Sequence, residues 1–175
     1  MRFPRPRSST AQQGFYPLTS RQTSTRPIWR ENMDSKPRIL LDLNIVLDVL
    51  ANRQPHYTDS ARTWAVVESG RAEGWLAAHS ITTLFYLLAR HTNRQRAIQA
   101  IHDVLQVFSV AAVDQSVIRR ALTLGWRDFE DAVQMAAAVQ AGVDYVITWN
   151  TKDFKGGPLP AIRPGEFLAL LTAWP

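Results

Sequence analysis

From Arg38 onward, short apolar runs alternate with longer stretches in which apolar residues recur every three to four positions. The short runs span residues 39–43, 74–78, 108–113 and 145–148, and a short edge strand is expected near Ala161. Runs this short with almost no polar residue are typical of strands buried on both faces of a sheet. Strands that alternate with helices favour parallel βαβ crossovers. We therefore predict an α/β fold, a three-layer α/β/α sandwich with a mainly parallel sheet of four to five strands.

Capping residues mark where the intervening helices begin and end. Polar side chains that can cap a helix stand before the periodic stretches, at Asn44, Ser80, Asp114 and Asp128, and Asp42 is the alternative cap of the first helix. Glycines close two of these stretches, at Gly70 and Gly142. We expect helices over residues 45–51, 55–70, 93–107, 129–141 and 165–171, with further helices after Ser80 and Asp114.

The positive charge of the chain is confined to its first residues. The net charge is +5, yet residues 1–30 contain six arginines and no acidic residue, and residues 33–175 contain 14 basic and 14 acidic residues. Residues 1–36 are also rich in Pro, Ser, Thr and Gln without apolar periodicity, which is typical of a disordered segment. We interpret residues 1–36 as a disordered basic leader, as sequence upstream of a true start at Met33, or as an arm that contacts nucleic-acid phosphates. Residues 37–172 form the predicted folded domain.

Several classes of protein are excluded by composition. The chain has no cysteine, which rules out disulfide scaffolds, thiolate zinc sites and cysteine nucleophiles. No apolar run approaches the roughly 18–20 residues of a membrane-spanning helix, and no secretory signal follows the first arginines. We therefore expect a cytoplasmic protein that makes no membrane contact.

Polar residues capable of chemistry follow two of the predicted strands. Asp42 ends the first apolar run, and the run at 145–148 leads into Thr148, Asn150 and Asp153. Parallel strands place their carboxyl ends at one edge of the sheet, where sites in such folds lie. Asp131, in the first turn of the helix expected at 129–141, is a third candidate, although acids there also complement the helix dipole.

Together these features resemble the PIN-domain family, which includes VapC-like ribonuclease toxins of toxin–antitoxin pairs. The resemblance covers about residues 37–171. Its motifs are the segment 41–50, which begins Leu-Asp-Leu-Asn, the segment 128–134, which begins Asp-Phe-Glu-Asp, and the segment 148–154, Thr-Trp-Asn-Thr-Lys-Asp-Phe.

The resemblance implies an active site made of Asp42, Asp131, Asp153, Asn150 and Thr148. Three of these residues, Asp42, Asp131 and Asp153, would bind Mg²⁺ or Mn²⁺, and Asn150 falls where many members have an acid. Thr148 would orient a water or the scissile phosphate. Asp48 matches a common acid of the first motif, and we interpret it as lying at the surface or behind the metal ligands. The resemblance further implies an RNA substrate and leaves room for a cognate antitoxin and a homodimer.

One family acid is missing. Relatives have an acidic residue on the helix after the second strand, but residues 80–86 contain none, and Leu84 or Thr83 occupies the matching position. The prediction is therefore a Mg²⁺-dependent endoribonuclease, with a catalytically impaired PIN fold that binds RNA or protein as the alternative. A haloacid-dehalogenase-like phosphatase also begins with a strand and an aspartate, but it normally has a second acid two residues on, where this chain has Asn44.

Overall fold

The computed structural model describes residues 36–174. The predicted leader at residues 1–36, with the alternative start at Met33, therefore lies outside the described residues except for Lys36. Within the described part, none of the helices is both long enough and apolar enough to cross a bilayer.

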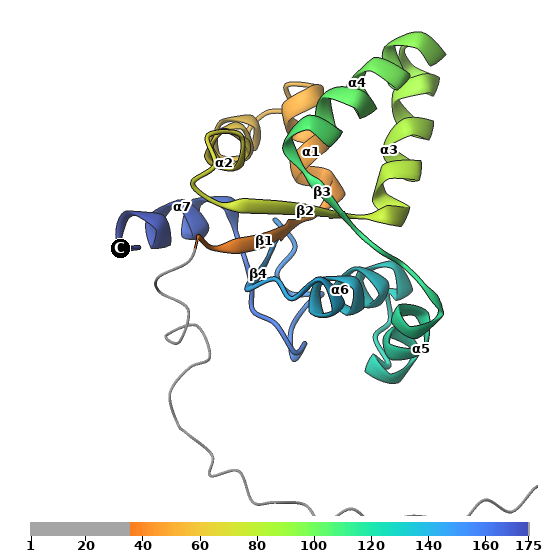
Figure 1. Cartoon of the computed structure of the whole chain (residues 1–175), viewed down its shortest axis with the longest axis vertical. Helices are drawn as coiled ribbons and strands as arrows, with labels where there is room; N and C mark the ends of the chain where they lie inside the picture. The colour runs from red at the N-terminus through yellow and green to blue at the C-terminus, as the bar shows by residue number, and fades with distance from the viewer. Residues whose placement is uncertain (1–35, 175) are drawn as a thin grey trace, which may run out of the picture.

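Five parallel strands form one sheet at the centre of the molecule (Figure 1). The strands are β1 (Arg38–Leu41), β2 (Glu73–Ala77), β3 (Ser109–Ala111), β4 (Tyr145–Ile147) and β5 (Ala161–Ile162). Their order across the sheet is β3-β2-β1-β4-β5, and every neighbouring pair is parallel. The predicted sheet of four to five strands is confirmed, and it is wholly rather than mainly parallel.

Helices cover both faces of this sheet and complete the three predicted layers (Figure 1). The helices on one face are α1 (Leu43–Leu50), α2 (Tyr57–Glu68), α3 (Ala78–His91), α4 (Arg94–Val107) and α7 (Pro164–Thr172). The helices on the other face are α5 (Gln115–Leu124) and α6 (Phe129–Ala141). Successive side chains of a strand point to opposite faces. In β1, Ile39 and Leu41 accordingly pack into the first core, and Leu40 packs into the second.

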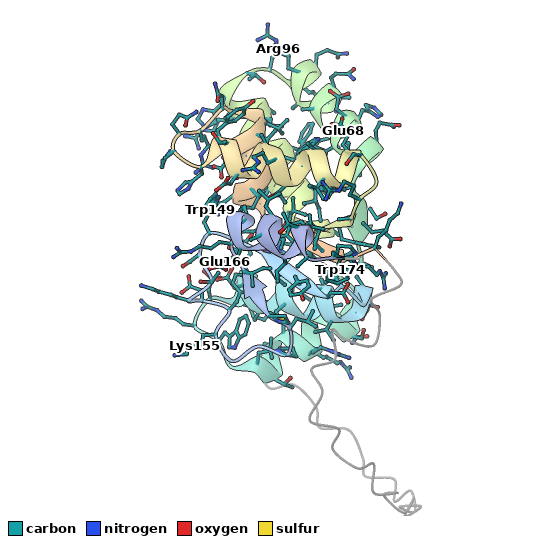
Figure 2. The ribbon with its side chains drawn as sticks, turned by 90° about the vertical axis from the view of Figure 1, so that its left-hand side faces the viewer. Glu68, Arg96, Trp149, Lys155, Glu166 and Trp174 are labelled. Carbon is teal, nitrogen blue, oxygen red and sulfur yellow. The ribbon has the colours of Figure 1, made fainter. Side chains whose placement is uncertain are left out.

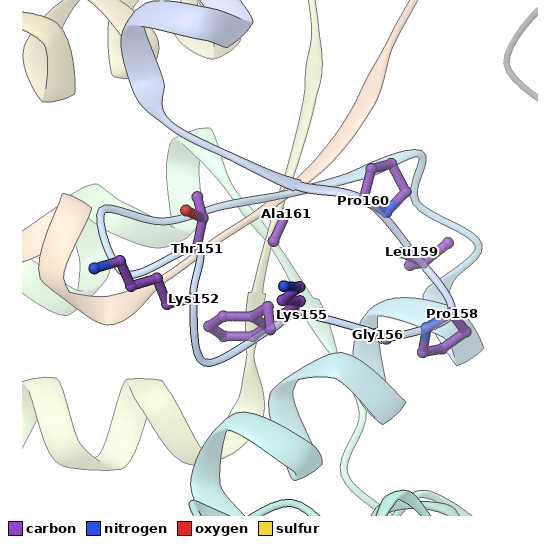
Figure 3. Close-up of a pocket in the computed structure, with 10 residues that line it drawn as sticks. Thr151, Lys152, Lys155, Gly156, Pro158, Leu159, Pro160 and Ala161 are labelled. Carbon is purple, nitrogen blue, oxygen red and sulfur yellow. The ribbon is translucent and has the colours of Figure 1, made fainter.

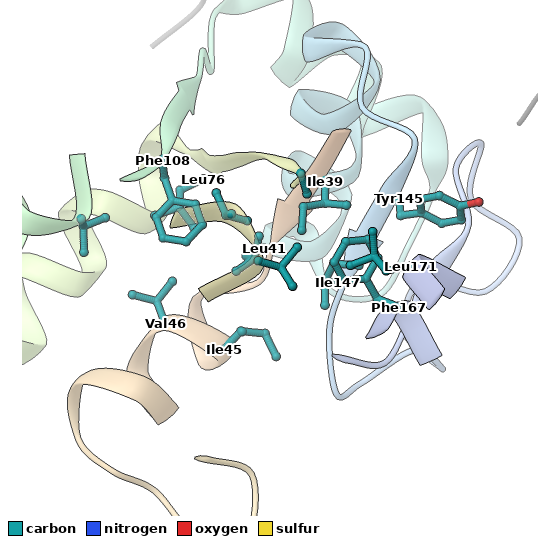
Figure 4. Packing of buried hydrophobic residues seen from close by; sticks show 14 of the residues in the cluster. Ile39, Leu41, Ile45, Val46, Leu76, Phe108, Tyr145, Ile147, Phe167 and Leu171 are labelled. Atoms are coloured by element: carbon teal, nitrogen blue, oxygen red, sulfur yellow. The ribbon is translucent and has the colours of Figure 1, made fainter. Parts of the chain in front are cut away.

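Apolar side chains of β1 and β4 pack against α1 and α7 in one core (Figure 4). Ile39, Leu41 and Ile147 are fully buried in it, together with Ile45 of α1 and Phe167 of α7. Burial of each such side chain contributes roughly 1.5–3 kcal/mol. Apolar packing on the face covered by α1 and α7 therefore stabilises the positions of the ends of β1 and β4.

Two of the predicted helix caps are wrong. Asp42, not Asn44, caps α1, because the Asp42 carboxylate accepts a hydrogen bond from the backbone N–H of Asn44 at 3.2 Å. Ser80 does not cap α3, which begins at Ala78 directly after β2 and has no side-chain cap. The caps predicted at Asp114 and Asp128 are confirmed, and Asn93, expected as the first residue of its helix, caps α4.

Candidate active site

Asp42 and Thr148 lie side by side at the carboxyl edge of the sheet. Leu41 of β1 pairs with Ile147 of β4, so the next residue on each strand emerges at the same point. The Thr148 hydroxyl donates a 2.7 Å hydrogen bond to Asp42 Oδ2, and the Asp42 backbone N–H donates to the Ile147 carbonyl at 2.9 Å. Thr148 is fully buried, so its hydroxyl orients Asp42 rather than facing solvent.

The turn after β4 brings Asn150 and Asp153 to the same edge. The Asn150 N–H donates to Thr148 Oγ1 at 3.0 Å, and the Asp153 N–H donates to the Asn150 carbonyl at 3.2 Å. The Asn150 side-chain amide also donates to the Asp153 carboxylate. Both side chains are exposed, so their remaining oxygens are open to a ligand.

Asp131 faces this group from the first turn of α6. Asp128 caps the helix by accepting from the backbone N–H groups of Glu130 and Asp131. Partial burial, followed by the negative charges of Asp128, Asp42 and Asp153, raises the pKa of Asp131 to about 7. The structure therefore brings Asp42, Asp131 and Asp153, which lie far apart in the sequence, within electrostatic reach of one another.

The donor groups at this edge suit a hard divalent cation. Carboxylate and amide oxygens are the ligands that Mg²⁺ prefers, and Mg²⁺ is commonly held by one or two carboxylates with waters completing its shell. Among residues 36–174, no three carboxylate or imidazole side chains already stand close enough to ligate one ion together. The residues present therefore fit a site with two protein carboxylates better than a closed cage.

The position of the missing acid holds an apolar residue, and its surroundings in the structure are apolar too. Leu84 of α3 is fully buried in the core formed with Ile39 and Leu41. The neighbouring Thr83 hydroxyl donates to the His79 carbonyl of its own helix. Neither residue supplies the site with a negative charge.

His79, in the first turn of α3, lies close to the first turn of α6. Its Nε2 atom lies 3.7 Å from Glu130 Oε1. Burial lowers the pKa of His79 more than the charge of Glu130 raises it, which favours the neutral imidazole. Neither ring nitrogen has a hydrogen-bond partner among the described residues. His79 is thus a polar group near the strand ends, and it cannot replace an acid's charge.

Two basic residues missed by the sequence analysis border the acids. A groove of about 580 Å³ is lined by Trp126, Arg127, Asp128, Lys152 and Asp153. Neither Arg127 nor Lys152 forms a salt bridge with a described residue. Their place in the sequence is the signal that could have identified them, since each directly precedes an acid of a recognised motif.

Lys152 also lines a second hollow, inside the loop between β4 and β5 (Figure 3). Lys155 and the Gly156–Pro158 turn lie on the same hollow. The Arg90, Arg94 and Arg96 side chains, a second basic cluster in the sequence, are instead exposed around the turn between α3 and α4. Figure 2 shows Arg96 at the top end of the molecule and Lys155 near the bottom, so this cluster is remote from the hollow that Lys152 and Lys155 line.

Of the two expectations for Asp48, the surface is wrong, and its place beside the turn after β4 agrees with the position behind the candidate site. Only 1% of Asp48 is exposed. The Trp149 indole N–H donates to Asp48 Oδ2 at 2.9 Å, and its ring packs on His56 with centroids 4.2 Å apart. The indole is therefore held by the protein and is not a free platform for a nucleotide base.

Comparison with known proteins gives a consistent assignment. Residues 38–152 match the PIN domain, which is about two thirds of the chain. No curated protein matches the chain in sequence.

Solved structures resemble the fold at low sequence identity. The VapBC-1 complex of nontypeable Haemophilus influenzae has a TM-score of 0.58 at 16% identity, covering 73% of this chain and 98% of the other. A toxin–antitoxin complex from Klebsiella pneumoniae has a TM-score of 0.56 at 22% identity, covering 72% and 97%. VapC20 from Mycobacterium tuberculosis, a sarcin–ricin loop cleaving toxin, has a TM-score of 0.51 at 19% identity, covering 62% and 86%. With its parallel sheet and the match over residues 38–152, the chain belongs to the PIN-domain family.

Proposed function

We propose that this protein is a metal-dependent ribonuclease of the PIN type and acts as the toxin of a toxin–antitoxin pair. The observation that carries the proposal is that Asp42 and Asp153 lie within electrostatic reach of Asp131 at the carboxyl edge of the sheet, with Thr148 bonded to Asp42. Carboxylates gathered at one point repel each other, and a cation removes that repulsion. The proposed cation is Mg²⁺ or Mn²⁺, and the proposed ligands come from Asp42, Asp131 and Asp153, with two of these carboxylates bound at a time and waters completing the shell.

Each residue of the site has a role that follows from its contacts. When bound, the cation supplies electrostatic stabilisation of the reacting phosphate and makes a water more acidic. Thr148 fixes the orientation of the Asp42 carboxylate through its 2.7 Å hydrogen bond. Asn150, bonded to Asp153, holds that carboxylate against the turn and can offer its own amide oxygen. A proton on Asp131 relieves the crowding of negative charge until a cation takes its place.

The groove beside the acids supports a nucleic-acid substrate. Arg127 and Lys152 present unpaired positive charges next to Asp128 and Asp153, and phosphate groups are commonly held by such side chains. RNA is the preferred substrate because VapC20, which shares this fold, is a sarcin–ricin loop cleaving toxin. An antitoxin partner is proposed because similar folds occur in toxin–antitoxin complexes.

The direct test is cleavage of a labelled RNA with purified protein. We expect cleavage with Mg²⁺ or Mn²⁺, none in EDTA, and a loss of at least about 100-fold in Asp42→Asn and Asp131→Asn, comparable to removal of one electrostatic group from an active site. Asp103→Asn, at an exposed position on α4, is the matched control. RNA cleavage that persists in EDTA or in both site variants would contradict the proposal.

A second candidate is a PIN fold that binds RNA without cutting it. The observation in its favour is the buried Leu84 at the position of the missing acid, which leaves the site one charge short. The same experiment separates the two, because a binding module retains RNA on a filter without producing fragments.

A further inference from the structure

A buried polar network lies directly behind the candidate site. Asp48 of α1 is 1% exposed and Ser60 of α2 is fully buried. Asp48 Oδ2 accepts from the Ser60 hydroxyl at 3.0 Å and from the Trp149 indole N–H at 2.9 Å. Asp48 Oδ1 lies 3.5 Å from Arg53 Nε. Burying a carboxyl group costs free energy unless hydrogen bonds or an ion pair compensate for the lost hydration. The burial of Asp48 therefore calls for a structural or functional explanation.

Helix α1 holds the segment after β4 at two points. At its N-terminus, Asp42 binds the Thr148 hydroxyl, and about a turn and a half later Asp48 binds the Trp149 indole. Trp149 lies between Thr148 and Asn150, two residues of the candidate site. The His56 ring packs on the other side of the network, at 4.2 Å from the indole. The backbone on which Thr148 and Asn150 lie is therefore tied to α1 through the Trp149 side chain as well as through Thr148.

We propose that Asp48 is a positioning residue for the active site. It fixes the Trp149 indole, and the fixed indole sets the turn that carries Asn150 and Asp153 beside Asp42. An apolar residue at position 48 would fill the same space but would leave the indole N–H with only the Ser60 hydroxyl, at 3.3 Å. The turn would then lose one of the contacts that hold it against α1, and Asn150 and Asp153 would not compensate because their side chains are exposed.

This inference rests on the proposed function for its catalytic meaning, but its structural part can be tested separately. The variants are Asp48→Leu, which removes both acceptors, Trp149→Phe, which removes only the indole donor, and Asp48→Asn, which retains an acceptor oxygen. The matched control is Trp64→Phe, because Trp64 packs edge-on against Phe108 in the core and not against the turn. The readouts are hydrogen exchange of the Asn150 amide, Mn²⁺ affinity by calorimetry, and kcat and KM for RNA.

For Asp48→Leu and Trp149→Phe we expect about tenfold faster exchange at Asn150 and about tenfold weaker Mn²⁺ binding, the size of one lost hydrogen bond to a charged group. The kcat for RNA should fall while KM changes little. Asp48→Asn should recover most of the loss, and Trp64→Phe should lower the melting temperature without altering exchange at Asn150.

The positioning role is wrong if folded Trp149→Phe exchanges the Asn150 amide at the wild-type rate and binds Mn²⁺ with the wild-type affinity. Trp149→Phe alone provides this test if Asp48→Leu does not fold. If the unmodified protein neither binds Mn²⁺ nor cleaves RNA, the proposed function fails. The exchange rate at Asn150 still reports whether Asp48 fixes the turn.

Discussion

The Thr148 hydroxyl donates a 2.7 Å hydrogen bond to the carboxylate of Asp42, joining two residues that are 106 positions apart in the sequence. Both side chains are buried, so water cannot easily replace either partner. The bond links the ends of β1 and β4 and fixes the carboxylate on which the candidate site is centred.

Replacement of Thr148 by valine tests that bond, because valine has nearly the same shape and lacks the hydroxyl. We expect the free energy of unfolding to fall by about 1.5–3 kcal/mol, the value of a buried hydrogen bond to a charged group. Urea denaturation measures the loss, and Thr148→Ser, which retains a hydroxyl, should be less affected. Equal stability of the valine variant and the wild type would mean that the bond does not contribute in solution.

The raised pKa of Asp131 predicts a specific dependence of stability on pH. Its folded-state pKa is about 7, against an ordinary value of 3.8, so the folded protein binds more protons than the unfolded chain between about pH 4 and pH 7. The stability that this proton contributes is fully present below about pH 4, and it is lost as the pH rises through 7. In EDTA, the melting temperature of the wild type should fall relative to that of Asp131→Asn across this window. Parallel curves for the two proteins would contradict the shifted pKa.

Metal addition should stabilise the protein by mass action. Mg²⁺ or Mn²⁺ at 100 times its dissociation constant adds about 2.7 kcal/mol to the free energy of unfolding if it binds only the folded state. Asp42→Asn retains a residue that caps helices well but lacks the charge, so it should respond much less to metal. Differential scanning fluorimetry with and without Mn²⁺ measures both responses. An identical shift in the variant would place any metal site away from Asp42.

Leu84→Glu tests whether the absent acid can be restored. Because Leu84 is fully buried among apolar side chains, we expect the new carboxylate to lack a partner and to cost about 3–5 kcal/mol or to prevent folding. Added Mg²⁺ should not recover the loss, and Leu84→Met should cost less than about 1.5 kcal/mol. A Leu84→Glu protein that folds and binds Mg²⁺ more tightly than the wild type would show instead that this side chain reaches the acids.

The groove predicts which basic residues contact RNA. Arg127→Gln together with Lys152→Gln should reduce the slope of log affinity against log salt by about 1.4, or about 0.7 for each lost phosphate contact on a single strand. Arg94→Gln with Arg96→Gln is the matched control, since it removes the same charge from the remote turn between α3 and α4. Fluorescence anisotropy across salt concentrations measures both slopes. A larger change in the control pair would place the RNA on the other end of the molecule.

Local pattern was sufficient for the sheet, and together with the resemblance to the PIN-domain family it singled out the candidate acids. The buried run of β1 and the apolar strand β4 are visible as short hydrophobic segments because both faces of a central parallel strand are covered by helices. Asp42, Thr148 and Asp131 could be selected for the same reason, since each follows a recognisable strand or opens a recognisable helix.

Tertiary structure alone decided how those residues act. The sequence left Asp48 either at the surface or behind the candidate site, and the structure decides for the second: Asp48 is buried and accepts from Ser60 and from Trp149, 101 residues away. The pKa of Asp131 is raised first by burial and by the nearby Asp128, and further by Asp42, which follows β1, and Asp153 of the turn after β4. Neither the burial nor these last two charges can be seen in the local segment. Sequence determines which groups can form such contacts. Which of them meet depends on the packing of β1 against β4 and of α1 against both, because hydrogen bonds and electrostatic interactions act over a few ångströms in space, whatever the separation along the chain.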